Sequence, residues 1–94
     1  MKRTIELRTH MSAGGYSVHL KINGQEFGEC SRSAGTALAV VQSIYRQLKT
    51  VYGRELFTRY VEYQDILAAM KAVAQIVKSM DVLYRQILRE ENNV

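Results

Sequence analysis

Few side chains in this sequence could carry acid–base or nucleophilic chemistry. His10 and His19 are the only histidines, and no Cys–His, paired-His or Ser–His–carboxylate spacing accompanies them. Glu6 and Glu26 could form a two-carboxylate site, but the strand pattern places Lys21 between them, which favours a charge ladder. The sequence therefore predicts no catalytic residues, no metal site, no cofactor and no enzymatic activity.

The glycine pair and the single cysteine also have ordinary interpretations. Gly14-Gly15 precedes a strand pattern, so it lacks the helix N-terminus that makes a phosphate cradle. We expect Cys30 to be a small buried residue, turned inward by a bulge at Gly28. One cysteine cannot form an internal disulfide, and no apolar run is long enough for a signal peptide or a membrane span. These features predict a cytoplasmic protein that does not enter a membrane.

Alternating side chains predict a three-stranded antiparallel meander within residues 1–31. A first strand covers residues 3–9, a loop covers residues 11–15, and a second strand leads to Asn23-Gly24, the dipeptide typical of a type I′ hairpin turn. This turn places Leu20 opposite Phe27, and the first hairpin places Leu7 opposite Leu20. Lys21 then lies between Glu6 and Glu26, and Arg8 lies opposite His19. Because apolar and opposite-charge partners match together, we expect this register.

Two helices are expected to follow, within one α+β domain spanning residues 1–94. The first helix is predicted over residues 33–52, with its N-cap at Ser31 or Ser33 and its C-cap at Gly53. The second is predicted over residues 54–91, either continuous or broken near residues 58–65. Its apolar residues repeat every seven positions, at Ile66, Val73, Met80 and Ile87 and, between them, at Tyr63, Met70, Val77 and Tyr84.

This second helix is too long and too apolar for a small domain to cover alone. A helix over residues 58–91 would be ~50 Å long at ~1.5 Å per residue. The seam is flanked by Ile76 and Leu83 on one side and by Leu67 and Leu88 on the other. We therefore predict a homo-oligomer or a protein partner, with an interface formed by Tyr63, Ile66, Met70, Val73, Val77, Met80, Tyr84 and Ile87.

A row of cations on the same helix indicates a second kind of partner. The net charge is +4, and Lys71, Lys78 and Arg85 repeat every seven residues, with Arg89 on the same side. Regularly spaced cations can follow a phosphate backbone, so these four residues are possible nucleic-acid contacts. A solvated helix face, partly neutralised by Asp81 beside Lys78 and Arg85, is the alternative interpretation.

The first half of the chain resembles the HicB-type antitoxin domain, a meander followed by a helix. The resemblance rests on Met1-Lys2-Arg3-Thr4-Ile5, Gly14-Gly15-Tyr16-Ser17-Val18, Cys30 and Gly35-Thr36, and covers about residues 1–48. This chain has the Asn23-Gly24 hairpin where that family has a proline-rich loop. The layout is also similar in size and style to small phage inhibitors of the anti-CRISPR type. Residues 22–27, followed by two helices, resemble Z-ring-associated division proteins.

All three resemblances imply a protein that acts by binding another protein. The leading hypothesis is a small non-enzymatic regulator or inhibitor, antitoxin-like or directed by a phage against host defence, and dimeric through its C-terminal helix. One alternative is a nucleic-acid-binding protein that uses the basic row. A further alternative is a structural, oligomeric adaptor of the cell-division-associated type.

Overall fold

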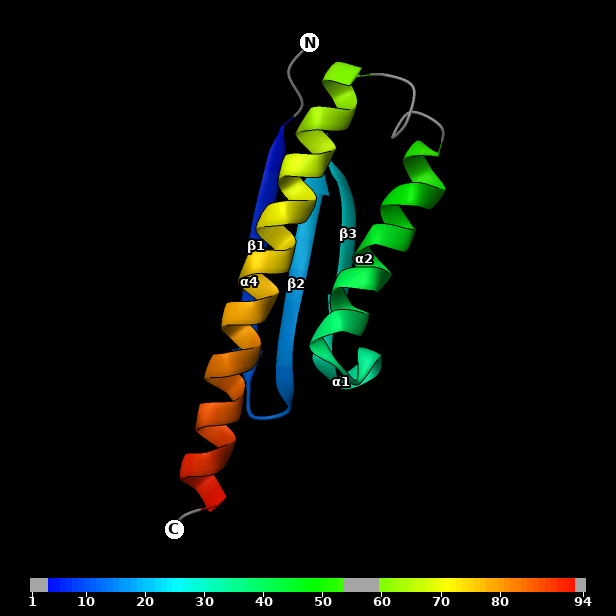
Figure 1. Cartoon of the computed structure of the whole chain (residues 1–94). Coiled ribbons are helices and arrows are strands. Elements are labelled where there is room, and N and C mark those ends of the chain that lie inside the picture. Colours follow the sequence, from blue (N-terminus) through cyan, green and yellow to red (C-terminus); the bar gives the residue numbers. More distant parts are fainter. Residues whose placement is uncertain (1–3, 54–59, 93–94) are drawn as a thin grey trace.

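The computed structural model describes residues 4–53 and 60–92 and has the predicted α+β architecture (Figure 1). Three antiparallel strands are arranged in the order β1-β2-β3, and helices follow. The elements are β1 (Ile5–Ser12), β2 (Gly15–Ile22), β3 (Gln25–Cys30), α1 (Ser31–Ala34), α2 (Ala37–Tyr52) and α4 (Tyr60–Asn92).

The predicted register of the sheet is confirmed. Leu7 lies opposite Leu20, which lies opposite Phe27, and Lys21 lies between Glu6 and Glu26. Asn23 and Gly24 both have positive φ angles, 51° and 85°, as a type I′ turn requires. The first connection is tighter than the predicted loop over residues 11–15. Ser12 already pairs with Gly15, so only two residues form this turn.

The predicted first helix is divided into two. The short helix α1 has Gly35 as its C-cap, with a φ of 89° that suits glycine. Helix α2 begins two residues after this glycine. The N-cap of α2 is Thr36, whose hydroxyl accepts a hydrogen bond from the backbone N–H of Ala39 at 3.1 Å. This finding corrects the predicted helix over residues 33–52 and its Ser31 or Ser33 cap. The predicted C-cap at Gly53 is confirmed.

Helix α4 runs without interruption from Tyr60 to Asn92. The predicted break is therefore not present between residues 60 and 65, and the remaining predicted segment, residues 54–59, lies outside the described residues. The chain measures 53 × 20 × 18 Å along its principal axes. In Figure 1 the C-terminal turns of α4 extend beyond the β1–β2 turn. The helix is thus longer than the sheet that it covers.

Both long helices pack on one face of the sheet and form a single core with it. Helix α2 lies against β3, and α4 lies against β2 and β1 (Figure 1). The core comprises Tyr16, Val18, Leu20, Ile22, Phe27, Val40, Ile44, Leu48, Ile66, Ala69, Val73 and Val77. The heptad seam of α4 is thus the side that faces its own sheet.

Candidate interaction surface

Most of the predicted interface residues are covered by the chain itself. Ile66, Val73 and Val77 are at most 1% exposed, so they cannot also contact a second subunit without unfolding. This corrects their assignment to an interface. Met70, Met80 and Tyr84 are half-buried against the core, and Ile87 is half-buried near the end of the helix. The side chain of Tyr63 lies outside the described residues.

Cys30 differs from its prediction as well. The pairing of β2 with β3 continues without a bulge through Gly28 to Ser17 opposite Cys30. Cys30 therefore lies on the outer face of the sheet, half-buried rather than in the core. Its Sγ lies 3.1 Å from Oγ of Ser33, a hydrogen bond that lowers the pKa of the thiol.

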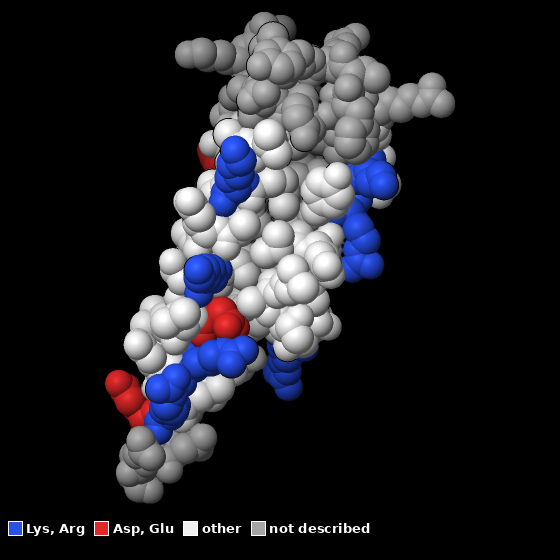
Figure 2. All heavy atoms as spheres, in the orientation of Figure 1, with Lys and Arg blue, Asp and Glu red and all other residues white. Residues whose placement is uncertain are grey.

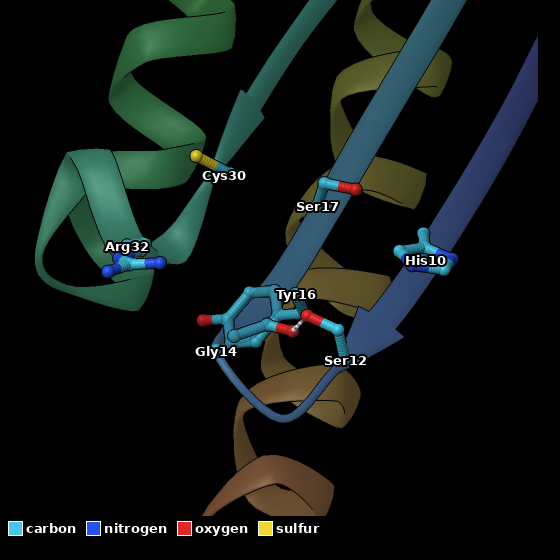
Figure 3. A pocket seen from close by; sticks show the side chains of 8 residues that line it. His10, Ser12, Gly14, Tyr16, Ser17, Cys30 and Arg32 are labelled. Carbon is cyan, nitrogen blue, oxygen red and sulfur yellow. Dashed lines mark hydrogen bonds between the residues drawn. The ribbon is translucent and has the colours of Figure 1, made fainter.

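A shallow hollow near Cys30 brings a thiol, a histidine and two serines to one end of the sheet (Figure 3). Figure 3 shows Ser17 on β2 between the His10 ring on β1 and the Cys30 side chain on β3. Within the described ranges, His10 forms no hydrogen bond with Ser17 or Cys30, and Ser12 donates instead to the carbonyl of Gly15 at 3.4 Å. Residues 4–53 and 60–92 also contain no group of three potential metal ligands.

An apolar groove between α2 and α4 is the most distinctive feature of the helical face. It is a cavity of about 240 Å³, with Leu38 and Val41 of α2 on one wall and Ala74, Val77 and Val82 of α4 on the other. Leu38 is 66% exposed and Val82 is 53% exposed, unusually high values for large apolar side chains in a small domain. Tyr45, which is 42% exposed, lies further along α2. The groove thus presents apolar surface that the chain leaves in contact with water.

Cations border this groove. Figure 2 shows Lys and Arg side chains following α4 along the face that carries the groove, and more of them over α2. On α4 these are the exposed residues Lys71, Lys78, Arg85 and Arg89, and on α2 they include Arg46 and Lys49. Lys78 itself lines the groove. Within the described part of the chain, Lys71, Lys78 and Arg89 form no ion pair, so their charges are available to an anionic partner.

Arg85 is the exception because it belongs to a hydrogen-bonded network that fastens α4 to the sheet. Its Nε donates to Oδ2 of Asp81 at 2.9 Å, and the Tyr16 hydroxyl donates to Oδ1 of the same carboxylate at 3.0 Å. The Tyr16 ring also meets Tyr84 edge-on, with ring centroids 6.0 Å apart. Burial, together with the bond to Asp81, raises the pKa of Tyr16 to about 12. The solvated-face interpretation was therefore correct in pairing Asp81 with Arg85, but Asp81 also has a structural role.

The groove was not predicted, although its residues were visible in the sequence. Leu38 and Tyr45 belong to the apolar stripe of the first helix, and such a stripe predicts burial without saying which of its edges stays exposed. Val82 follows Asp81 outside the heptad seam and gave no signal. The angle at which α2 and α4 diverge decides which side chains are covered, and that angle is set by packing across the whole core.

Comparison with protein-family models, with curated proteins and with solved structures finds no match to this chain. Among the described helices, none is both long enough and apolar enough to cross a bilayer.

Proposed function

We propose that this protein is a small non-enzymatic regulator or inhibitor that binds a protein partner through the groove between α2 and α4. The exposure of Leu38 and Val82 on facing helices is the observation that carries the proposal. Contiguous exposed apolar surface with a polar border is characteristic of protein-binding sites. The antitoxin-like and phage-inhibitor-like layouts of the sequence agree with this class of function, as does the division-adaptor resemblance.

The border of the groove defines the chemistry of the partner. Lys78 lines the groove together with Asp81, which already bonds Arg85, and the exposed cations Lys71 on α4 and Arg46 and Lys49 on α2 add positive charge to these two helices. A partner segment with acidic residues beside one or two large apolar anchors would complement both features, and an amphipathic helix presents such residues at i, i+3 and i+4. Apolar anchors would supply most of the affinity, and the charges would speed association and make it dependent on salt.

The decisive experiment compares two aspartate variants on the two flanks of α2. Leu38→Asp places a charge in the groove, whereas Thr50→Asp places the same charge on an exposed position of the other flank. Proteins captured from the native host by the wild type would be purified, and each binary complex measured by isothermal titration calorimetry. We expect Leu38→Asp to weaken the complex by about tenfold or more and Thr50→Asp to change it less than about threefold. A partner that both variants bind as the wild type does would contradict the groove as its site.

Nucleic-acid binding remains a second candidate because Lys71, Lys78 and Arg89 lie on one side of α4 without ion-pair partners in the described chain. Duplex affinity measured from 50 to 200 mM salt tests it, since each neutralised phosphate steepens the salt dependence. Lys71→Glu with Lys78→Glu should abolish such binding, and the uncharged variant Leu38→Asn should leave it unchanged. Negligible affinity at low salt would refute this candidate.

The neighbouring genes would separate the protein-binding subclasses, since a toxin, a phage region and a division cluster each imply a different partner.

A further inference from the structure

Within the part of the chain that the structure describes, the outer edge of β1 carries a row of backbone groups without partners. Thr4 and Asn23 exchange two hydrogen bonds, from Asn23 N to Thr4 O at 2.9 Å and from Thr4 N to Asn23 Oδ1 at 3.0 Å. Backbone N–H and C=O groups alternate in direction along an antiparallel strand. In β1, those of the even-numbered residues point toward β2. The N–H and C=O groups of Ile5, Leu7, Thr9 and Met11 point outward, and no bond to them occurs within the described residues. This edge is a template for a further strand.

The charges of β1 make the strand complementary to itself in one register. In antiparallel pairing of two β1 strands around Leu7, Leu7 lies opposite Leu7 of the second copy, and Glu6 lies opposite its Arg8. Moving the centre to Glu6 or to Arg8 would place like charges opposite each other, which is unfavourable. The register centred on Leu7 also lets the outward groups of Ile5, Leu7 and Thr9 form hydrogen bonds with the second copy. Backbone direction allows every register that pairs odd-numbered residues with each other, and among those centred on Glu6, Leu7 and Arg8 the charges favour the one centred on Leu7.

The flank of α4 above this edge is shaped for a second helix. Ala72 and Ser79 are small and exposed, and with Gln75, Ile76 and Leu7 they line a hollow of about 350 Å³. The same flank continues to Leu83, which is 48% exposed. The hollow is level with Leu7, the residue on which the register is centred. Helix α4 lies over β1 and β2, so the α4 helices of two copies joined through β1 would be about two to three strand spacings, or ~10–15 Å, apart. The shorter end of this range is the distance between packed helices.

We propose that two copies of this chain join through their β1 edges into one continuous antiparallel sheet, with Leu7 on the twofold axis. Ile76 of each copy then enters the hollow beside Leu7, between Ala72 and Ser79 of the other α4. This interface differs from the seam predicted from the sequence, because it uses the edge of the sheet and the outer flank of α4. It is separate from the groove between α2 and α4, which lies on the opposite flank of α4, so it does not rest on the proposed function.

The first test measures association and backbone protection of the wild type together. Sedimentation equilibrium should show a monomer–dimer equilibrium. Amide hydrogen exchange by NMR should show protection of Ile5, Leu7 and Thr9 that rises at least about tenfold between concentrations at which monomer and dimer predominate. A chain that remains monomeric up to about 1 mM would overturn the proposal. A dimer in which these three amides exchange as fast as in the monomer would also overturn the proposal, because such a dimer forms through other residues.

A charge exchange then tests the register. Glu6→Arg or Arg8→Glu alone places like charges opposite each other twice in the dimer, and each should raise the dissociation constant by about tenfold. The double variant restores the Glu6–Arg8 ion pair within each chain in any register, but it restores opposite charges between the two copies only if position 6 faces position 8. In that case it should recover a dissociation constant within about threefold of the wild type. Circular dichroism checks that each variant folds. A double variant that associates no better than the single variants would overturn this alignment.

Discussion

The two edge strands of the sheet differ in whether their outward backbone groups are hydrogen-bonded within the described residues. At the β3 edge, the side-chain amide of Gln47 on α2 accepts a hydrogen bond from Gly28 N at 3.1 Å and donates one to Gly28 O at 2.8 Å. Glu29 accepts a bond from the Cys30 N–H at 3.0 Å, on the same edge. The β1 edge has no such cover within the described residues. A single glutamine thus takes the place of a fourth strand on one side only.

The difference follows from how each helix contacts the sheet. Helix α2 lies beside β3, where Gln47 reaches the backbone of the edge strand and the Ser43 hydroxyl donates to the Glu29 carboxylate. Helix α4 lies across β2 and β1 and meets them with apolar side chains and the Tyr16–Asp81 hydrogen bond. An exposed edge strand invites pairing, and proteins usually block one that is not used. Within the described residues, therefore, α2 blocks the β3 edge and no element blocks the β1 edge.

Proline substitution at equivalent positions of the two edges should have the largest and most unequal effect. Gly28→Pro removes the N–H that donates a hydrogen bond to Gln47. This change should lower the free energy of unfolding by about 2–3 kcal/mol. Thr9→Pro removes an N–H that has no partner in the monomer, so the cost there should be less than about 1 kcal/mol. Urea denaturation of the monomeric protein measures both.

The control for this comparison is Gly28→Ala. A Cβ at this position would lie 2.7 Å from Nδ1 of His19 and 3.1 Å from the Val18 carbonyl oxygen, so part of the proline effect is steric. Gly28→Ala isolates that part. If Gly28→Pro is no more destabilising than Gly28→Ala, or if the two prolines cost the same, the two edges do not differ as described.

Removing the glutamine should have the next largest effect. Gln47→Ala leaves the N–H and C=O of Gly28 without their partners, and we expect a loss of about 1–2 kcal/mol in the free energy of unfolding. The neighbouring variant Gln42→Ala, at an exposed position of the same helix, should change stability by less than about 0.5 kcal/mol. Thermal denaturation of both variants measures the difference. Equal melting temperatures would show that water replaces Gln47 without loss.

The strand half of the fold was predictable in detail, and the helical half less so. The β2–β3 register followed from Asn23-Gly24, because a two-residue turn fixes the pairs beyond it, and a shift by one residue would have placed Leu20 on the solvent side. The β1–β2 register followed from matching Leu7 with Leu20 and Glu6 with Lys21. The division of the first helix was signalled by Gly35-Thr36, a glycine stop followed by a good N-cap, but the serines before it offered an equally plausible start. Local sequence does not distinguish two acceptable caps when tertiary packing decides between them.

The surface was the least predictable part. A heptad seam indicates only that a helix face will be buried, and Ile66, Val73 and Val77 are buried by their own sheet rather than by another subunit. The role of Gln47 depends on where α2 lies relative to β3, a position that no spacing in the sequence records. The exposure of Leu38 and Val82 likewise depends on the gap between two helices.

The smallest predicted effect concerns the polar attachment of α4, the counterpart of Gln47 on the β1 side of the sheet. Tyr16→Phe removes the hydrogen bond to Asp81, which keeps its bond to Arg85, so the cost at neutral pH should be about 1 kcal/mol.

The pKa of Tyr16 is raised from 10.0 to about 12, so the folded state holds this proton more tightly than the unfolded state. The contribution of Tyr16 is therefore complete below pH 10 and is lost as the pH rises toward 12. Denaturation curves of wild type and variant should differ at pH 8 and converge above pH 11. A variant as stable as the wild type at pH 8 would mean that Tyr16 contributes through its ring packing on Tyr84, which phenylalanine keeps, rather than through its hydroxyl, and that α4 has no polar attachment comparable to Gln47.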